Sequence, residues 1–521
     1  MAIYRDLISA ARECPDAIAL EFEGQGISYR RFHDRASRVA AALQLAPLPR
    51  KAAVGVMLPN LPEFLYVTYG AFFDGRVMTP MSVLLTPREA RHIIRDSALK
   101  LLFVTASVVD VVEQAIAGLS EAPDLVVVGD YTGPHQTFDR FCDAGGEAVF
   151  DPIHPDQHML TLYTSGTTGP SKGVMISDRG MRTQVDMICT TFDPAPGTRI
   201  LCVLPLFHAY ALNALVSTAI RRRMTVVLHA RFDPEACATS LADDRIDWFA
   251  GVPTMYDYLL KQGEARPDLS FSNLDVCLTG GAAMSGDLLS GFEQRFGAPI
   301  YEGYGLTETT VSVASNGPSP HRRKIGSVGQ PYVGMQGRVL DEAGLPCPAG
   351  VIGELAFRGG NMMLGYLNCP DETAQVLRDG WLHTGDLGYI DADGFCFIVG
   401  RKKDLIIKSG YNIVPLEVED AIRTATSVRD VAVVGLPDPV RGERILAAVI
   451  LHDGATPTQA RAQIEATARR FLAKYKHPNE IWFVAEFPLG PSGKILKRAL
   501  RDSWLTRVKP KEIEEDVCIT A

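Results

Sequence analysis

Short runs of aliphatic residues recur along most of the chain, and the spacers between them are long enough to hold a helix. A helical pattern lies at residues 63–73, and the strand-like runs lie at 51–58, 101–105, 125–128, 200–203, 224–228 and 276–279. Aliphatic strands separated by helices are typical of parallel sheets that are covered on both faces. The sequence therefore predicts an α/β fold for the larger, N-terminal part of the chain.

The pattern changes after Gly353, where short strands alternate with glycine and aspartate turns. Residues 391–394 (DADG) are typical of a hairpin turn. Further helices are predicted at 415–423 and 459–471, and strands at 431–436, 445–451 and 480–484. This mixture predicts a small α+β domain of about 120 residues, with the boundary near Arg401.

Composition excludes several classes of function. The net charge of −9 argues against a general nucleic-acid binder, which would be basic. Ten scattered cysteines without a C-x-x-C pair indicate neither a zinc site nor a disulfide framework. No run of 18 apolar residues is present, so no membrane span is expected. Without a signal-peptide pattern at the N-terminus, we expect a cytoplasmic protein.

The segment 162–177, LYTSGTTGPSKGVMIS, predicts a loop that wraps a phosphate group. Its glycines allow backbone N–H groups to point at an anion, and its hydroxyls and Lys172 add further donors. It is not a Walker A loop, because Ser171 precedes the lysine and Gly173 follows it. A P-loop NTPase is therefore disfavoured.

Five motifs in order resemble those of the adenylate-forming superfamily, which comprises acyl-CoA synthetases, adenylation domains of peptide synthetases and luciferases. They are TSGTTGPSKG at 164–173, YGLTE at 304–308, HTGD at 383–386, GRKKDLIIKSGYNIVPLEVE at 400–419 and PLGPSGK at 488–494. The order Pro170-Ser171 departs from the usual form of the first motif, and its effect is left open.

The resemblance implies two half-reactions and two domains. ATP and a carboxylate give an acyl-adenylate and pyrophosphate, and a thiol then displaces AMP. Residues 1–400 would form an adenylation domain that includes a small distorted β-barrel. Residues 401–403 would be a hinge centred on Lys403, and residues 404–521 would form a mobile domain.

The resemblance also assigns site residues. Lys494 would bridge the carboxylate and the α-phosphate, with Thr307, Glu308 and His208 also catalytic. Glu308 and Thr164 would bind Mg²⁺, and Lys408, Ser409 and Gly410 would border the CoA arm. The implied ATP and AMP contacts are Thr164, Ser165, Gly166, Thr167, Thr168, Gly169, Lys172, Gly281, Ala282, Ala283, Glu302, Gly303, Tyr304, Gly305, Thr307, Asp386, Arg401 and Lys494.

The acyl pocket implied by the resemblance contains no charged residue apart from a histidine. Its residues would be His208, Tyr210, Gly251, Val252, Gly281 and Gly305. An unpaired charge buried in such a pocket would be costly. We therefore expect an acid with an uncharged tail: a medium- or long-chain fatty acid first, an aryl or cyclic acid second.

CoA is the expected acceptor, because no carrier segment follows Lys494. Two alternatives remain open: a stand-alone enzyme that loads a carrier protein, and a non-catalytic relative that binds nucleotide and regulates a partner. The sequence does not distinguish a monomer from a homodimer. The resemblance further implies a lysine acetyltransferase that acts on Lys494.

Overall fold

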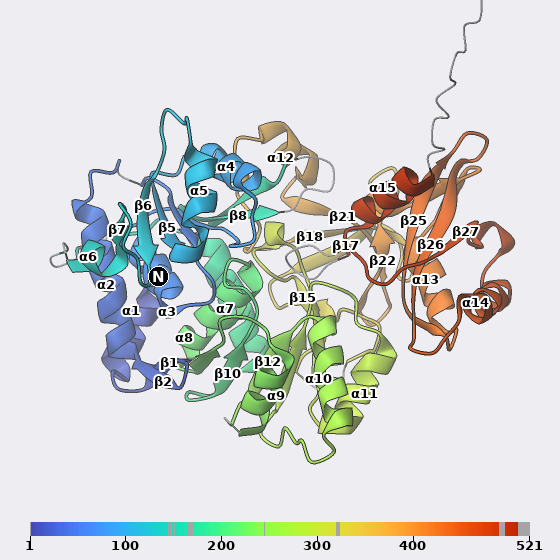
Figure 1. Cartoon of the computed structure of the whole chain (residues 1–521), viewed down its shortest axis with the longest axis horizontal. Helices are drawn as coiled ribbons and strands as arrows, with labels where there is room; N and C mark the ends of the chain where they lie inside the picture. The colour runs from blue at the N-terminus through green and yellow to red at the C-terminus, as the bar shows by residue number, and fades with distance from the viewer. Residues whose placement is uncertain are drawn as a thin grey trace, which may run out of the picture. The chain divides into compact units, whose positions relative to one another are not determined.

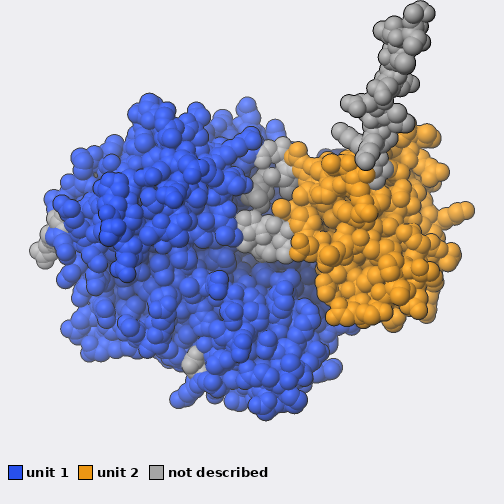
Figure 2. All heavy atoms as spheres, in the orientation of Figure 1, with its two compact units in different colours: residues 1–384, 389–398 blue, residues 385–388, 399–521 orange. Residues whose placement is uncertain are grey.

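The computed structural model describes residues 2–49, 51–143, 145, 148–150, 152–164, 170–243, 245–318, 323–488 and 495–508. The chain divides into two compact units (Figure 2). The first comprises residues 1–384 and 389–398, and the second comprises residues 385–388 and 399–521. The continuous part of the second unit therefore begins at Val399.

A nine-stranded sheet organises much of the first unit (Figure 1). In spatial order its strands are β16 (Gln330–Pro331), β15 (Ala314–Ser315), β14 (Ile300–Tyr304), β13 (Val276–Thr279), β12 (Trp248–Gly251), β10 (Arg199–Cys202), β11 (Thr225–Leu228), β1 (Ile18–Phe22) and β2 (Gln25–Ser28). The run from β14 to β1 is parallel, whereas β2, β15 and β16 pair antiparallel. The parallel strands therefore end at one common edge.

An eight-stranded sheet is the second large sheet of this unit. Its order is β19 (Gly365–Tyr366), β9 (Lys172–Ser177), β8 (His158–Thr164), β4 (Met78–Pro80), β3 (Val54–Met57), β5 (Leu101–Thr105), β6 (Asp124–Val128) and β7 (Gln136–Thr137). The strands from β8 to β7 are parallel, and β9 runs antiparallel to both β8 and β19. This edge of the sheet carries the predicted phosphate loop between β8 and β9.

Helices and the two sheets alternate in five layers. The helices of this unit are α1 (Arg5–Glu13), α2 (Tyr29–Leu45), α3 (Pro62–Phe73), α4 (Pro87–Asp96), α5 (Val109–Ile116), α6 (Phe138–Asp143), α7 (Asp178–Phe192), α8 (Thr218–Arg222), α9 (Pro234–Asp243), α10 (Pro253–Ala265), α11 (Gly286–Phe296) and α12 (Pro370–Val376). Two short 3-10 helices, η1 (Ala106–Val108) and η3 (Thr307–Thr309), and a π-helix, η2 (Tyr210–Ser217), join them. Helices α2, α3, α7 and α8 share the core between the sheets, α9 to α11 cover the outer face of the nine-stranded sheet, and α4 and α5 cover that of the eight-stranded sheet.

A smaller, five-stranded sheet follows in the chain. It consists of β17 (Gln336–Leu340), β18 (Gly353–Arg358), β21 (Trp381–Ile390), β20 (Leu377–Arg378) and β22 (Cys396–Arg401). β17 pairs antiparallel with β18, and β20 with β21. The predicted turn at 391–394 joins β21 to β22, and Gly394 adopts the positive φ of 84° that the turn requires.

The second unit is built on its own five-stranded sheet, β24 (Tyr411–Ile413), β23 (Ile406–Lys408), β26 (Gly442–Leu451), β25 (Val428–Asp438) and β27 (Glu480–Phe483). One core packs α13 (Pro415–Arg423) and α14 (Pro457–Phe471) on this sheet, and a second core packs α15 (Lys497–Val508) on it. Two 3-10 helices, η4 (Lys402–Asp404) and η5 (Lys474–Lys476), complete the unit.

The predicted fold class is confirmed. Mixed and parallel sheets with flanking helices form the first unit, the small five-stranded sheet stands where the small barrel was expected, and an α+β unit follows. β5 and β13 have the predicted bounds, as does α13. Among the described residues, no helix is both long enough and apolar enough to cross a membrane.

Two glycines with similar backbone angles provide a stability test. Gly329 has φ of 85°, and an added methyl group would lie 1.9 Å from the carbonyl carbon of Ser315. Gly344 has φ of 80° and open space around the same position. We expect Gly344→Ala to cost about 1–2 kcal/mol of unfolding free energy from backbone strain alone. Gly329→Ala should cost more than about 4 kcal/mol, because a backbone clash is added. Urea unfolding of the two variants measures this, and equal losses would contradict the packing at Ser315.

Candidate functional site

Many of the predicted AMP contacts and acyl-pocket residues of the first unit lie together at one edge of the nine-stranded sheet. Strands β14, β13, β12 and β10 are neighbours and run parallel. The segments that follow their carboxyl ends are 303–305, 280–283, 251–252 and 203–210. Ligands of open α/β sheets bind in crevices outside the carboxyl ends of strands. The fold therefore brings these four predicted segments to a position suited to a ligand.

Small residues follow β13 at this edge, and they are buried at Gly280 but exposed from Gly281 to Ala283. A methyl group on Gly280 would lie 3.2 Å from the carbonyl oxygen of Gly303 and 3.9 Å from Tyr210 Cε1. Gly281 has φ of 81°, and its added methyl would lie 3.8 Å from Val252 Cγ1. Ala282 and Ala283, which follow, are exposed. A flat group such as a nucleobase can therefore approach the main chain here.

Glu302 is buried in the middle of β14, with a relative exposure of 5%. Burial raises its pKa from 4.5 to about 7, which the hydrogen bond donated by Met284 N–H at 3.3 Å opposes. The next residues, Gly303 and Tyr304, pair with β15, and the Tyr304 ring centre lies 5.9 Å from that of Phe357. Glu302 is therefore protonated in part near neutral pH and can donate as well as accept a hydrogen bond.

The chain reverses tightly after Gly305. A methyl group on Gly305 would lie 2.1 Å from the carbonyl oxygen of Val311, so only glycine fits. Thr310, at the reversal, has φ of 64°, which is unusual for a β-branched residue. Strained backbone of this kind persists only where its surroundings fix it.

Two buried amides that sequence reasoning missed hold this reversal. Asn361 Nδ2 donates to the carbonyl oxygens of Thr309 at 2.8 Å and Ser312 at 2.9 Å. Gln184 Oε1 accepts from Ser312 N–H at 2.9 Å, and Thr310 Oγ1 donates to the carbonyl of Asn361 at 2.7 Å. Both amides are fully buried, so the turn beside Glu308 is rigidly supported.

Thr307 and Glu308 lie in the short helix η3, and both are partly exposed. The Glu308 carboxylate Oε1 accepts a hydrogen bond from the Tyr366 hydroxyl at 2.7 Å, and the Glu308 carbonyl accepts from Met363 N–H at 2.8 Å. Burial, and after it the charge of Glu308, raises the pKa of Tyr366. Tyr366 is a second residue that the motifs did not reveal.

The phosphate loop starts and ends on a paired hairpin. Thr164, the last residue of β8, lies opposite Lys172, the first residue of β9. The carbonyl of Ser171 accepts a hydrogen bond from His92 Nε2 at 2.7 Å, so the unusual Pro170-Ser171 order is compatible with an anchored loop end. The predicted contacts Ser165, Gly166, Thr167, Thr168 and Gly169 lie outside the described residues.

Within the described part of the chain, the Lys172 ammonium group contacts Glu372 and Tyr366. Its Nζ lies 3.9 Å from Glu372 Oε1 and 5.1 Å from the centre of the Tyr366 ring. Tyr366 therefore contacts both Lys172 and Glu308, the two residues that the resemblance assigns to the phosphates and to Mg²⁺. Among the described residues, no group of three histidine, cysteine or acidic side chains forms a metal site. A Mg²⁺ ion bound with ATP would fit a sparse set such as Glu308 and Thr164, because phosphates and water complete its shell.

His208 has an unpaired nitrogen. Its Nε2 is buried and has no hydrogen-bond partner among the described residues. Burial lowers the pKa of His208 from 6.5 to about 4, so the ring is neutral. The ring lies 4.2 Å from that of Phe207, and Tyr210, two residues on, begins the π-helix η2. An orphaned buried nitrogen indicates a site that a ligand group can satisfy.

Asp386, Arg401 and Lys403 are three of the predicted residues of the second unit that the structure describes. Arg401 Nε lies 3.0 Å from Asp386 Oδ1, so these two predicted ATP and AMP contacts are paired. Lys403 is exposed in η4. Lys494 lies outside the described residues.

The predicted CoA segment forms a tight hairpin between β23 and β24. Ser409 and Gly410 occupy its turn, with φ of 53° and 82°. Lys408 is buried, and burial, followed by the charge of Arg441, lowers the pKa of its amine.

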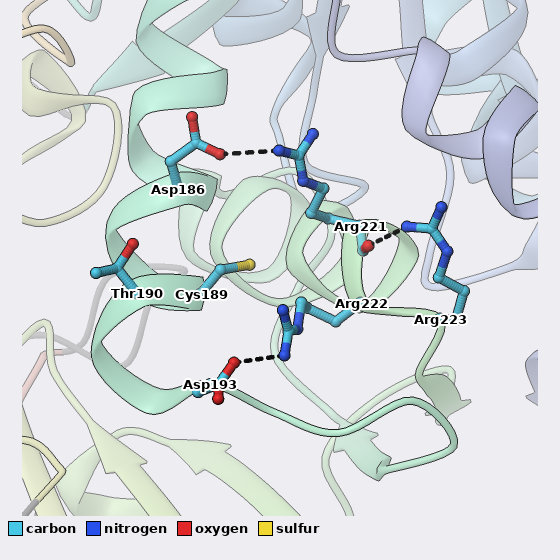
Figure 3. A pocket seen from close by; sticks show the side chains of 7 residues that line it. All are labelled: Asp186, Cys189, Thr190, Asp193, Arg221, Arg222 and Arg223. Atoms are coloured by element: carbon cyan, nitrogen blue, oxygen red, sulfur yellow. Dashed lines mark hydrogen bonds and ion pairs between the residues drawn. The ribbon is translucent and has the colours of Figure 1, made fainter.

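A cavity of about 480 Å³ lies elsewhere on the first unit, beside α7 and α8 (Figure 3). Arg221, Arg222 and Arg223 line it with Asp186, Cys189, Thr190 and Asp193. The guanidinium groups are paired: Arg221 with Asp6 at 2.7 Å, Arg222 with Asp193 at 2.5 Å and Arg223 with Glu13 at 2.6 Å. The arginines therefore tie α1, α7 and α8 together and leave little charge for an anion.

Comparison with known proteins gives matches over most of the chain. A family model described as AMP-binding enzyme matches residues 7–367, and one described as AMP-binding enzyme C-terminal domain matches residues 417–494. A sulfoacetate–CoA ligase of Cupriavidus necator is 35% identical, with 92% of each chain covered. A long-chain-fatty-acid–CoA ligase of Bacillus subtilis is 33% identical, covering 95% of this chain and 93% of that protein. The crystal structure of ATP-bound MatB from Rhodopseudomonas palustris superimposes with a TM-score of 0.89 at 29% identity, over 97% of this chain and 99% of that one.

The titration of Glu302 predicts how stability changes with pH. Because its pKa is higher in the folded than in the unfolded chain, Glu302 costs stability as pH rises from 4.5 to about 7, and the cost is complete above that range. Glu302→Gln should therefore be more stable than the parent at alkaline pH, by up to about 3 kcal/mol. The advantage should vanish below pH 4.5. Urea unfolding across this range measures it, and a pH-independent difference would contradict the titration.

Proposed function

The chain belongs to the family of AMP-binding enzymes, and from that premise we propose that it is an ATP-dependent, AMP-forming acyl-CoA synthetase. The observation that carries the proposal is the edge of the nine-stranded sheet. There, exposed small residues, a buried unpaired histidine nitrogen and a partly exposed carboxylate follow neighbouring parallel strands. These groups suit a nucleobase, a carboxylic acid and a metal-bound phosphate respectively.

In the first half-reaction, an oxygen of the substrate carboxylate attacks the α-phosphorus of ATP, and the bond to the β-phosphate oxygen breaks. We assign the holding of the leaving pyrophosphate to the loop between β8 and β9 with Lys172. Glu308 and Thr164 would hold a Mg²⁺ ion, which would neutralise part of the charge on the phosphates. Lys494 would stabilise the charge that develops on the α-phosphate, the kind of contribution that dominates such transfers.

His208 would orient the acid. Its neutral ring can donate from one nitrogen only, and no described residue is a partner of Nε2. A hydrogen bond from Nε2–H to the substrate carboxylate would satisfy that nitrogen and direct the second oxygen at ATP. A neutral donor also leaves the carboxylate nucleophilic, whereas a positively charged imidazole would form an ion pair with the carboxylate and weaken it as a nucleophile.

In the second half-reaction, the CoA sulfur attacks the acyl carbon, AMP leaves and the thiol proton passes to solvent. We propose that residues 1–400 form the adenylation domain, that 401–403 are a hinge and that 404–521 are a mobile domain. Exposed Lys403 within the short helix η4 supports the hinge. The Ser409-Gly410 turn would border the CoA arm, since its glycine offers no side chain.

We further propose an acid with an uncharged tail. Phe207, Val252, Leu306 and Val311 are apolar, partly exposed and packed at the strand ends. No basic residue occurs in segments 203–210, 250–253, 280–284 and 303–315 apart from neutral His208. The two curated relatives act on very different acids, sulfoacetate and long-chain fatty acids. A second anionic group would find no cation in these segments, which favours the neutral tail.

Carrier-protein loading and non-catalytic nucleotide binding are the competing functions. The oligomeric state, monomer or homodimer, stays open. The cytoplasmic location and the acetylation of Lys494 stay predictions.

An acid panel tests the function. Pyrophosphate release and CoA thioester formation are measured with fatty, aryl and dicarboxylic acids. We expect release with neutral-tailed monocarboxylates and at least about tenfold lower kcat/KM with sulfonated or dicarboxylic acids, since an unpaired buried charge is costly. Pyrophosphate release without a CoA thioester would indicate a carrier protein as acceptor. ATP binding without release for any acid would contradict an enzyme.

Lys494→Gln separates the half-reactions. Loss of the ammonium group should lower pyrophosphate release at least about a hundredfold, as for removal of other transition-state donors. Thioester formation from supplied acyl-adenylate should stay within about threefold of the parent, because the charge of Lys494 serves only the first step. Equal losses in both half-reactions would contradict this role.

A further inference from the structure

Residues 363–367 bind along the strand that starts at Lys172 and reach the carboxylate of Glu308. Tyr366 and Gly365 pair with Val174 and Met175. On either side, Leu364 N–H donates to Met175 O at 2.8 Å and Leu367 N–H donates to Gly173 O at 2.7 Å. Tyr366 is thus fixed at its backbone to the hairpin that carries the phosphate loop.

The backbone of Tyr366 is also held from the other side. Thr373 Oγ1 accepts a hydrogen bond from Tyr366 N–H at 2.8 Å. Gly365 has φ of 144°, and an added methyl group would lie 2.8 Å from Thr373 Cγ2. These contacts restrict the backbone conformation of Tyr366, and with it the direction in which the side chain leaves the main chain.

The side chain of Tyr366 then joins two groups of opposite charge. Its hydroxyl donates to Glu308 Oε1 at 2.7 Å, and the face of its ring lies 5.1 Å from Lys172 Nζ. Met363, three residues earlier, donates its N–H to the Glu308 carbonyl at 2.8 Å. Segment 363–366 therefore fixes Glu308 at both main chain and side chain.

A phenol suits this position better than a cation would. It is a neutral donor, so it fixes one carboxylate oxygen while Glu308 keeps its full negative charge and its other oxygen. Lysine or arginine in its place would neutralise the charge that attracts a divalent cation. The ring attracts the Lys172 ammonium without offering an anion that competes with a phosphate.

We propose that Tyr366 is a positioning residue that fixes Glu308 for a divalent cation and Lys172 for the phosphates of the same nucleotide. The inference rests on the proposed function, in which these two residues act on metal and phosphate. It adds a residue outside all five motifs, and it assigns different tasks to the hydroxyl and to the ring.

Binding of Mn²⁺ in the presence of ATP and without acid tests the hydroxyl, with free Mn²⁺ followed by electron paramagnetic resonance. Tyr366→Phe should weaken Mn²⁺ binding about tenfold, since it removes a hydrogen bond to a charged group. It should raise the Mg²⁺ concentration for half-maximal pyrophosphate release by a similar factor, with the KM for the acid unchanged.

Tyr29→Phe is the matched control. Tyr29 is buried away from the site, and its hydroxyl donates to the Met224 carbonyl at 2.7 Å. The control should show parental Mn²⁺ binding even where its melting temperature falls. Mn²⁺ binding of Tyr366→Phe equal to that of the control would overturn the proposal.

Tyr366→Leu tests the ring and serves if the phenylalanine variant does not fold. It should weaken Mn²⁺ binding as Tyr366→Phe does and also raise the Kd for ATP at saturating Mg²⁺, because Lys172 loses its aromatic partner. Parental Mn²⁺ binding in this variant would equally overturn the proposal.

Glu308→Gln separates this proposal from the function beneath it. Weak Mn²⁺ binding in Glu308→Gln with parental binding in both Tyr366 variants would overturn the role of Tyr366 alone. Parental Mn²⁺ binding in Glu308→Gln would instead remove Glu308 from the metal site, and the role of Tyr366 would fall with it.

Discussion

The common edge at which the parallel strands of the nine-stranded sheet end is the constraint on which the site of the first unit depends. Parallel pairing in register places the carboxyl ends of β10, β12, β13 and β14 side by side, although they are far apart in sequence. All four strands pack one face on helices α9 to α11, and β10 and β12 bury their other face in the core between the sheets. The core therefore holds the segments after the strands in place. Glycines in these segments can then let a ligand approach the main chain.

The backbone at this edge is locally strained, and buried polar groups compensate for the strain. The reversal after Gly305 places Thr310 in a region that β-branched residues avoid. Asn361 and Gln184, both fully buried, satisfy its backbone groups. Since a buried amide that lost these partners would cost free energy, the network favours one conformation of the turn. Glu308 immediately precedes this turn and is held in place with it.

Sequence reasoning reached the fold and the family because both leave local patterns. Aliphatic runs gave β5 and β13 their bounds, and the ordered motifs gave the superfamily, which the matches over residues 7–367 and 417–494 confirm. The roles of individual site residues stay predictions. The contacts of Asn361, Gln184, His92 and Tyr366 left no such pattern, because each joins segments remote in sequence through one side chain. The distance from Tyr366 to Glu308 is set by the pairing of β19 with β9, which no single motif encodes.

The protonation states of the site show how it can discriminate among charged substrates. His208 is neutral because burial lowers its pKa to about 4, Glu302 titrates near neutral pH, and Tyr366 is a neutral donor. The carboxylate and ammonium side chains named beside the phosphate hairpin are Glu308, Lys172 and Glu372, which lies 3.9 Å from Lys172 Nζ. The proposed tasks of Glu308 and Lys172 are the metal and the phosphates. Neutral groups surround the positions proposed for the base and the acid. The base and the acid would therefore be recognised by their shape and by hydrogen bonds. On the proposed assignments, the charged groups that would attract ATP are separate from the neutral groups that would select the acid.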